Sequence, residues 1–200
     1  MEPVSTVVGT AVPLPLANVD TDQIVPKQFL KRVERSGFGE FLFYDWARDA
    51  EGELEPSFVL NDPAYADGKI LVAGPNFGSG SSREHAPWAL EDWGFKAVIA
   101  QSFADIFSNN CTKIGVLPIV LSPLEVDALM ELASRTPNTV TVDLNDQTVT
   151  AEGFAASFDI DPHTKHCLLH GLDDIALTLE QNQEIGGFEE ERPAFKTVVR

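Results

Sequence analysis

The residues best suited to chemistry lie in one glycine- and serine-rich loop, Gly74 to His85, with the sequence Gly-Pro-Asn-Phe-Gly-Ser-Gly-Ser-Ser-Arg-Glu-His. Glycine adopts backbone dihedrals that other residues avoid, so such a loop can bring backbone N–H groups close to a ligand. A short apolar run precedes the loop and apolar residues at helical spacing follow it, which points the positive end of a helix at the same ligand. Arg83 adds a forked cation that matches a carboxylate or a phosphate. The loop is therefore predicted to bind an anion.

The loop does not match the common phosphate-binding or nucleophile motifs. Arg83 stands where a dinucleotide-binding fingerprint needs its third glycine, and neither the Gly-Lys-Ser/Thr of a Walker loop nor a G-x-S-x-G elbow is present. Ser81 and Glu84 have the spacing of a capping box, but Pro87 would then remove a hydrogen bond inside the helix. Either the helix begins near Glu84 or its first turn is distorted. Both cases leave the N–H groups of residues 80–83 available to a ligand. The alternative to an anion-binding loop is a turn with a purely structural role.

A second cluster of reactive side chains follows Asp161, where an Asp-Pro pair begins a predicted helix that Gly171 ends. Its members are His163, His166, Cys167 and His170. On a helix they lie on neighbouring turns and could offer metal ligands, but their spacing matches no standard zinc pattern. A polar helix face is the favoured interpretation, so no metal site is predicted.

Two single residues have open roles. His85 is an acid or base by type, or a residue that braces the loop. Cys111 has no catalytic histidine at a recognisable family spacing, so a structural role is predicted. With Cys167 the chain has 2 cysteines, too few for a disulfide framework or for an iron–sulfur cluster held by this chain alone. This cysteine usage indicates a reducing cytoplasm.

The composition is that of an acidic globular protein. The chain has 200 residues, 44% of them hydrophobic, and a formal net charge of −17, which argues against sequence-independent binding to nucleic acid or to an anionic membrane. Its apolar runs are shorter than the roughly 18 residues of a membrane span, and Met1 to Val4 lack the basic region of a signal peptide. A single domain over residues 1–200 is predicted, with its core at about 7–180 and an acidic, mobile tail at about 186–200.

Apolar periodicity and turn residues predict a series of strands and helices. The expected strands are 7–16, 69–73, 96–100 and 116–121, followed by a hairpin of 139–144 and 147–150. The expected helices run from the loop to about residue 93, within 101–115, from Ser122-Pro123 onward, over 161–171, and from Asp173 onward as the last. Pro118 places strand 116–121 at an edge or a bulge. Asn18 to Gln23 is expected to form turns. The aromatic residues of 36–50 are expected to pack in the core or in a lid rather than to form a cofactor site.

Several co-linear stretches resemble one known family. Residues 78–85, Gly-Ser-Gly-Ser-Ser-Arg-Glu-His, are similar to the swivelling domain of the aconitase superfamily. Residues 18–32, 37–46, 102–110 and 171–179 narrow the likeness to the small subunits of bacterial 3-isopropylmalate dehydratases. The resemblance extends from about residue 9 to residue 180, so it covers nearly the whole chain.

The resemblance implies an α/β fold, the three-layer β/β/α swivelling domain of the aconitase type. It implies a hydro-lyase that is active only with a larger subunit carrying a [4Fe–4S] cluster, while this chain binds no cofactor itself. The implied reaction removes water from 2-isopropylmalate and returns it at the adjacent carbon to give 3-isopropylmalate, in leucine biosynthesis. The alternatives are a related substrate (citraconate or methylmalate, dimethylmalate, homoaconitate), a non-catalytic anion-binding module, or a zinc hydrolase that uses the histidine cluster.

The resemblance also implies roles for particular residues. Ser81 is the base that removes the proton next to a carboxylate, and a serine can act so only if its alkoxide is stabilised by Arg83 and by N–H groups in a water-poor site. The substrate-binding residues that the resemblance implies are Gly80, Ser82, Arg83, Phe29, Leu30 and Lys31. Of these, Phe29 and Leu30 are expected to meet the isopropyl group, a discrimination worth about 1–3 kcal/mol per methylene.

Overall fold

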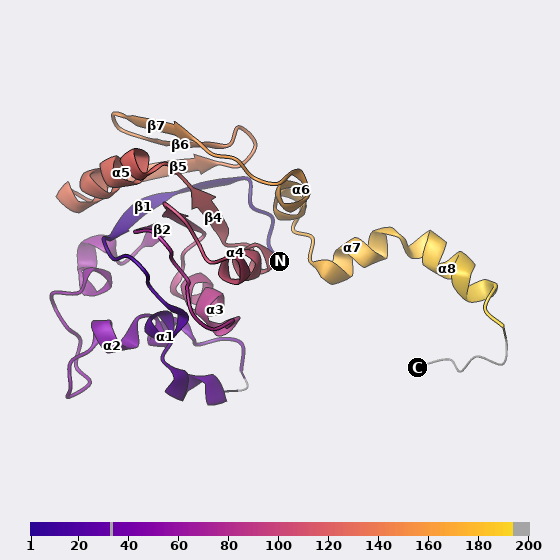
Figure 1. Ribbon diagram of the computed structural model, residues 1–200, viewed down its shortest axis with the longest axis horizontal. Helices are drawn as coiled ribbons and strands as arrows, with labels where there is room; N and C mark the ends of the chain where they lie inside the picture. The colour runs from indigo at the N-terminus through magenta and orange to yellow at the C-terminus, as the bar shows by residue number, and fades with distance from the viewer. Residues whose placement is uncertain (33, 194–200) are drawn as a thin grey trace.

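One mixed sheet of seven strands organises the chain, in the order β4-β3-β2-β1-β5-β6-β7 (Figure 1). The computed structural model describes residues 1–32 and 34–193. The strands are β1 (Thr6–Leu14), β2 (Gly68–Ala73), β3 (Ala97–Ala100), β4 (Leu117–Val120), β5 (Thr139–Asp143), β6 (Thr148–Ala151) and β7 (Phe154–Ser157). Strands β1 to β4 pair in parallel, and β1 also pairs antiparallel with β5, so β1 joins the parallel and antiparallel halves of the sheet.

The chain also forms helices, some of which pack on the two faces of this sheet. They are α1 (Thr21–Ile24), α2 (Tyr44–Ala47), α3 (His85–Trp93), α4 (Asp105–Ile114), α5 (Pro123–Arg135), α6 (Pro162–His170), α7 (Asp174–Glu180) and α8 (Asn182–Glu190), with 3-10 turns at Lys27–Lys31, Gly39–Phe41, Val59–Asn61 and Pro63–Tyr65. Across the described residues, each helix is too short or too polar to cross a membrane.

Two apolar cores lie on opposite faces because successive strand side chains alternate. In β2, Leu71 packs with buried residues of α3 and α4, whereas Ile70 packs with buried residues of α5 and α6. Helix α5 contacts β1, β2 and β7, so the sheet curls around it. The predicted α/β class is confirmed, and α3 and α4 are the helices that reach the glycine- and serine-rich loop.

Most of the predicted elements are confirmed, and the sharpest agreement is at α5. The Ser122 side chain accepts from the N–H of Glu125, the Glu125 carboxylate accepts from the N–H of Ser122, and Pro123 is the first helical residue. Strand β4 lies at the edge of the sheet, as Pro118 predicts. The expected core packing of the aromatic segment is also confirmed, since Phe38 and Phe43 are fully buried.

Three elements differ from the sequence-based expectation. The segment predicted as turns contains the short helix α1, capped by a reciprocal pair in which Asp20 accepts from the Gln23 N–H and the Gln23 side chain accepts from the Asp20 N–H. Strand β7 was not expected, because its Phe-Ala-Ala-Ser sequence has little strand character. Helix α8 follows α7, which was expected to be the last helix.

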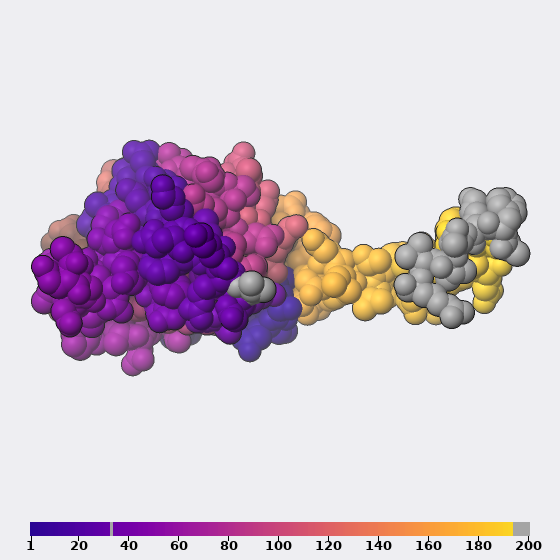
Figure 2. Space-filling model, turned by 90° about the horizontal axis from the view of Figure 1, so that it is seen from below, coloured from indigo at the N-terminus to yellow at the C-terminus, as the bar shows by residue number. Residues whose placement is uncertain are grey.

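Helices α7 and α8 project from the body as a narrow arm, coloured yellow in Figures 1 and 2. Helix α8 reaches Glu190, so the first part of the predicted tail is helical. Residues 194–200 of that tail lie outside the described residues, and the mobility of the tail stays a prediction.

Candidate functional site

The glycine- and serine-rich loop joins β2 to α3 and is held by the segment around α1. The N–H of Gly78 donates to the carbonyl of Val19 at 2.8 Å, and the N–H of Thr21 donates to the carbonyl of Ser79 at 2.9 Å. The buried Thr21 hydroxyl donates to the carbonyl of Ser81 at 2.8 Å. Two stretches 60 residues apart in sequence therefore form one braced unit.

Helix α4 forms the other wall of this unit. Gly78 has a φ of +75°, and a Cβ there would lie 2.1 Å from Cγ of Phe107. Phe107 is buried and its ring centroid lies 5.4 Å from that of Phe77. A glycine is thus required at position 78 for two reasons, the backbone conformation and the close approach of α4. The sequence predicted that the glycine is needed for its backbone conformation. It did not predict that the Phe107 side chain occupies the space of a Cβ at this position.

Helix α3 begins at His85, which settles how Pro87 is accommodated. Glu84 is the N-cap and makes no side-chain cap bond, so Ser81 and Glu84 do not form a capping box. Pro87 is the third helical residue, where a backbone N–H would lack an intrahelical partner anyway. The His85 ring lies 5.1 Å from the Phe38 ring and 4.8 Å from the Trp88 ring, measured between centroids. Of the two roles open to His85, these contacts support the bracing role.

The loop and the first turn of α4 enclose a hollow of about 230 Å³. Its lining residues are Thr21, Gly78, Gly80, Ser81, Ser82, Arg83, Ala104, Asp105, Ile106 and Phe107. Ser81 and Ser82 are exposed, so their hydroxyls are accessible to a ligand. The structure therefore brings together four of the seven predicted site residues: Gly80, Ser81, Ser82 and Arg83.

Arg83 is engaged by a carboxylate of its own chain. Its two terminal nitrogens, Nη1 and Nη2, donate to Oδ1 and Oδ2 of Asp22 at 2.6 and 2.8 Å, and Nη1 also donates to the Val25 carbonyl at 3.4 Å. The Arg83 side chain is 13% exposed and that of Asp22 is 51% exposed. The sequence predicted that the fork would hold a carboxylate, but Asp22 was treated only as part of a turn. The sequence feature that could have indicated this pairing is the position of Asp22 in the Asp-Thr-Asp-Gln run, between the two residues that cap α1.

The Asp22–Arg83 pair makes the stability of the fold depend on pH. The hydrogen bond from Arg83 lowers the pKa of Asp22 below its ordinary value, and the positive charge of Arg83 adds to this. A carboxyl with a lowered pKa stabilises the fold above its unfolded-state pKa of about 3.9, and this stabilisation is lost as pH falls through the folded-state pKa. Asp22→Asn should therefore cost stability in urea unfolding at pH 6, and the difference from wild type should shrink below about pH 4. A difference that stays constant down to pH 3 would show that the pair contributes nothing through ionisation.

Phe29, Leu30 and Lys31 lie in the 3-10 turn Lys27–Lys31 and do not line the hollow beside Ser81. The Phe29 ring stacks on Phe41 with centroids 4.1 Å apart. Leu30 is partly buried against the core, and Lys31 is exposed. The structure thus separates these three from the loop residues, and their contact with a substrate stays a prediction.

The histidine cluster divides into two pairs on α6. Cys167 Sγ lies 3.7 Å from His163 Nε2, and the rings of His166 and His170 are 4.3 Å apart. Among the described residues, no group of three or more His, Cys, Asp and Glu side chains is arranged to hold a metal ion. Cys111 is fully buried, which raises its pKa and supports the predicted structural role.

A larger hollow of about 390 Å³ lies elsewhere, between the segment 39–61 and the end of α3. Three of its polar side chains form hydrogen bonds with nearby backbone groups, and Glu40 pairs with Arg32. Arg48 donates to the Gly52 carbonyl, Asn61 donates to two carbonyls, and Asp92 accepts from the Gly39 N–H. The smaller hollow at Ser81 is the better candidate site because it joins exposed hydroxyls with a forked cation.

Comparisons with known proteins agree along the whole chain. The family model described as Aconitase C-terminal domain matches residues 1–124, and the model described as LeuD_N matches residues 127–162. The small subunit of 3-isopropylmalate dehydratase from Halalkalibacterium halodurans is 58% identical over 193 residues, covering 96% of this chain and 100% of the relative. The subunit of the same name from Dinoroseobacter shibae is 56% identical over 201 residues and covers both chains fully, at 100% each.

A solved structure extends the likeness to three dimensions. The crystal structure of 3-isopropylmalate dehydratase from Methanocaldococcus jannaschii matches with a TM-score of 0.66 and 25% sequence identity, over 92% of this chain and 99% of that one. The α/β swivelling-domain fold expected from the resemblance is confirmed by this match and by the aconitase-domain model. The chain belongs to the family of 3-isopropylmalate dehydratase small subunits.

Proposed function

We propose that this chain is the small subunit of a cytoplasmic hydro-lyase that isomerises 2-isopropylmalate to 3-isopropylmalate in leucine biosynthesis. The observation that carries the proposal is the 58% identity to a subunit of that name over 96% of the chain. The braced loop, with its exposed serines beside Arg83, supplies chemistry of the required kind. The substrate is a dianion, and one of its carboxylates suits the N–H groups and the guanidinium at the hollow.

The Ser81 side chain is the proposed base. During dehydration its alkoxide takes a proton from the carbon next to a carboxylate, a double bond forms, and the hydroxyl on the adjacent carbon leaves as hydroxide, so that the proton held by Ser81 and the hydroxide together make up the water that is lost. Rehydration reverses these steps with the hydroxyl placed on the other carbon. A serine alkoxide needs a nearby positive charge and exclusion of water. Arg83 supplies the charge, but Ser81 is exposed in the isolated chain, so another surface must close over it.

That surface is proposed to belong to a large subunit that carries a [4Fe–4S] cluster. The residues of this chain do not fit such a cluster, because Cys111 is buried in the core and Cys167 lies beside His163. Three or four thiolates are normally required, and the chain has 2 cysteines. The cluster would act as a Lewis acid on the leaving hydroxyl.

Reconstitution with the large subunit tests this function. The two chains are mixed under anaerobic conditions, and isopropylmaleate formation from isopropylmalate is followed by its ultraviolet absorbance. Turnover is expected only with both chains present, and faster with isopropylmalate than with citramalate. Faster turnover of citramalate would assign the chain to a related hydratase, and an assembled complex that turns over neither acid would contradict the function.

Arg83→Lys is expected to raise KM for isopropylmalate at least tenfold in this assay, with a smaller effect on kcat. Lysine replaces a planar fork with a single point charge, so both the two-oxygen contact to Asp22 and the recognition of a carboxylate are weakened. Arg48→Lys is the matched control, since Arg48 lines the other hollow. An unchanged KM in Arg83→Lys would remove Arg83 from substrate binding.

A further inference from the structure

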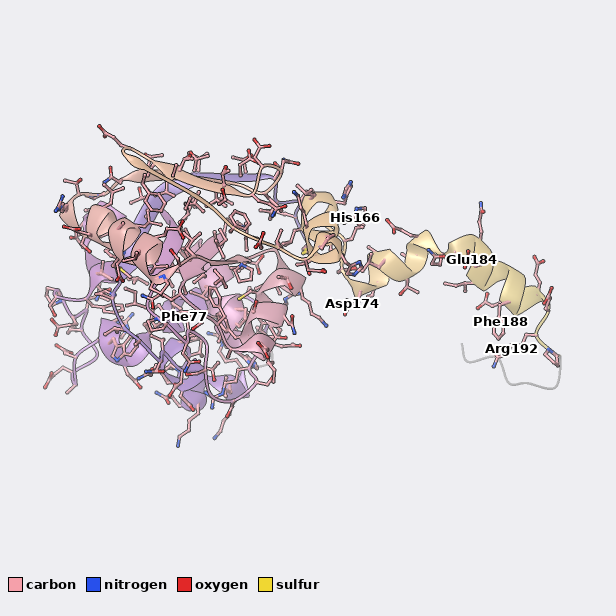
Figure 3. The ribbon with its side chains drawn as sticks, turned by 45° about the horizontal axis from the view of Figure 1, so that its top comes forward. Phe77, His166, Asp174, Glu184, Phe188 and Arg192 are labelled. Carbon is pink, nitrogen blue, oxygen red and sulfur yellow. The ribbon has the colours of Figure 1, made fainter. Side chains whose placement is uncertain are left out.

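The arm formed by α7 and α8 carries apolar side chains that the described part of the chain leaves in solvent. Ile175 and Leu179 are 71% and 61% exposed, and they are four residues apart, so they share one face of α7. Phe188 on α8 is 71% exposed. Figure 3 places Phe188 and Glu184 on the outer part of the arm, far from Phe77 in the body. Large apolar side chains gathered on a projecting element mark an interaction surface.

The root of the arm is a defined structure. Gly171 ends α6 with a φ of +67°, and the Leu172 N–H donates to the Cys167 carbonyl at 2.9 Å. Asp173 caps α7 by accepting from the Ala176 N–H at 2.8 Å. Asp174 then pairs with Lys113 of α4 at 3.1 Å. These contacts therefore fix the direction in which the arm leaves the body.

The two helices of the arm are too short to be stable alone. Helix α7 has 7 residues and α8 has 9, whereas isolated helices shorter than about 12–15 residues are marginal in water. Helix α8 also contains Gly186 and Gly187, each costing about 1 kcal/mol relative to alanine. Packing against another surface would supply the missing stabilisation.

The negative charge of the arm argues against a second copy of this chain as the surface on which the arm packs. Residues 173–191 contain seven carboxylates, Asp173, Asp174, Glu180, Glu184, Glu189, Glu190 and Glu191, and no lysine or arginine. Each chain has a net charge of −17, so two arms or two bodies repel one another. The complementary surface is an apolar groove with basic residues at its rim.

Helix α4 connects the arm to the site that a partner must cover. Asp105, Ile106 and Phe107 at its beginning line the hollow beside Ser81, and Ile106 is itself 54% exposed. Lys113 in its last turn holds Asp174 at the root of the arm. The ten residues of α4 span about 15 Å, so one partner can close the hollow and reach the arm together.

We propose that the α7–α8 arm is a docking element for the large subunit, in which Ile175, Leu179 and Phe188 enter an apolar groove with a basic rim. This inference rests on the proposed function for the existence of that partner. It adds a second contact region, at the opposite end of α4 from the reacting groups, that fastens the two chains together.

The test measures assembly without turnover. Binding of the full chain to the large subunit is titrated by biolayer interferometry under anaerobic conditions for wild type, Leu179→Glu and Leu124→Glu. Leu124 is 83% exposed on α5, which packs on the other face of the sheet. Leu124→Glu therefore makes the same substitution at an exposed leucine outside the arm. Leu179→Glu is expected to raise Kd at least tenfold, and Leu124→Glu to leave it within about twofold.

Hydrogen exchange provides a second readout that does not depend on a variant. Amides of residues 174–190 should exchange at least tenfold more slowly in the complex than in the isolated chain. Unchanged binding by Leu179→Glu, or arm amides that gain no protection, would overturn the proposal. A dimer of the isolated chain that sediments as such and is abolished by Leu179→Glu would also overturn it, since the occupant would then be a second copy.

The two proposals fail in different ways. A wild-type complex that assembles through the arm but does not dehydrate isopropylmalate contradicts the proposed function and leaves the docking role standing. A complex that turns over isopropylmalate and assembles equally well with Leu179→Glu contradicts the docking role alone.

Discussion

Ser81→Ala should lower kcat of the reconstituted enzyme by roughly 10²–10⁴-fold, the range expected for loss of a general base. The Ser81 side chain is exposed at the hollow, and the bond that ties this residue to Thr21 uses its backbone carbonyl. Removing the hydroxyl should therefore leave the loop, the fold and the assembly with the large subunit unchanged. The measurement is the initial rate of isopropylmaleate formation at saturating substrate, with Kd for the large subunit as the check on assembly.

Ser82→Ala is the matched control for this prediction. Ser82 is the neighbouring exposed serine and lines the same hollow, so it undergoes the same chemical change in nearly the same place. If Ser82 only positions the substrate, its loss should act mainly on KM and lower kcat less than tenfold. A larger loss of kcat in Ser82→Ala than in Ser81→Ala would move the base to Ser82.

Gly78→Ala should lower the free energy of unfolding by about 2–5 kcal/mol. Left-handed backbone costs an ordinary residue about 1–2 kcal/mol, and overpacking adds about 1–3 kcal/mol. Both apply here, because φ is +75° and the new Cβ would lie 2.1 Å from Cγ of Phe107. Urea unfolding of the isolated chain, monitored by tryptophan fluorescence, gives the value.

Gly153→Ala separates the two causes. Gly153 has a similar φ of +72°, but a Cβ there would meet nothing within 4 Å. Its loss of stability should stay near the conformational cost of about 1–2 kcal/mol. Equal losses in the two variants would mean that α4 moves away from the loop at little cost, and the close packing of Phe107 would not be what requires a glycine at 78.

The sequence was sufficient to predict those parts of the fold that depend on one short segment of the chain. The capping pair at Ser122 and Glu125, the edge position of Pro118 and the hairpin of β5 and β6 each follow from a few neighbouring residues. The same holds for the position of the loop between β2 and α3, while its role as an anion site stays a prediction. Helix α8 was missed because Gly186 and Gly187 weaken the helical signal of their segment.

Contacts between distant segments could not be derived in this way. Arg83 and Asp22 are 61 residues apart, and no periodicity relates them. The same applies to Phe107, which requires a glycine at 78 because α4 folds back over the loop. Conversely, the resemblance implies that Phe29, Leu30 and Lys31 bind the substrate together with Ser81. They do not line the hollow at Ser81, and their contact with a substrate stays a prediction. Under the proposed function the large subunit supplies the remaining walls of the site, and one chain alone does not show them.

The bracing of the glycine-rich loop has a consequence for the thermodynamics of substrate binding. A loop with three glycines is the kind of segment that loses the most conformational entropy when a ligand orders it. Here the loop is immobilised while the chain folds by its hydrogen bonds with Val19 and Thr21, by the ring of Phe107 and by the Asp22–Arg83 pair. The hollow is thus preorganised, and binding of the proposed dicarboxylate substrate would not have to order the loop.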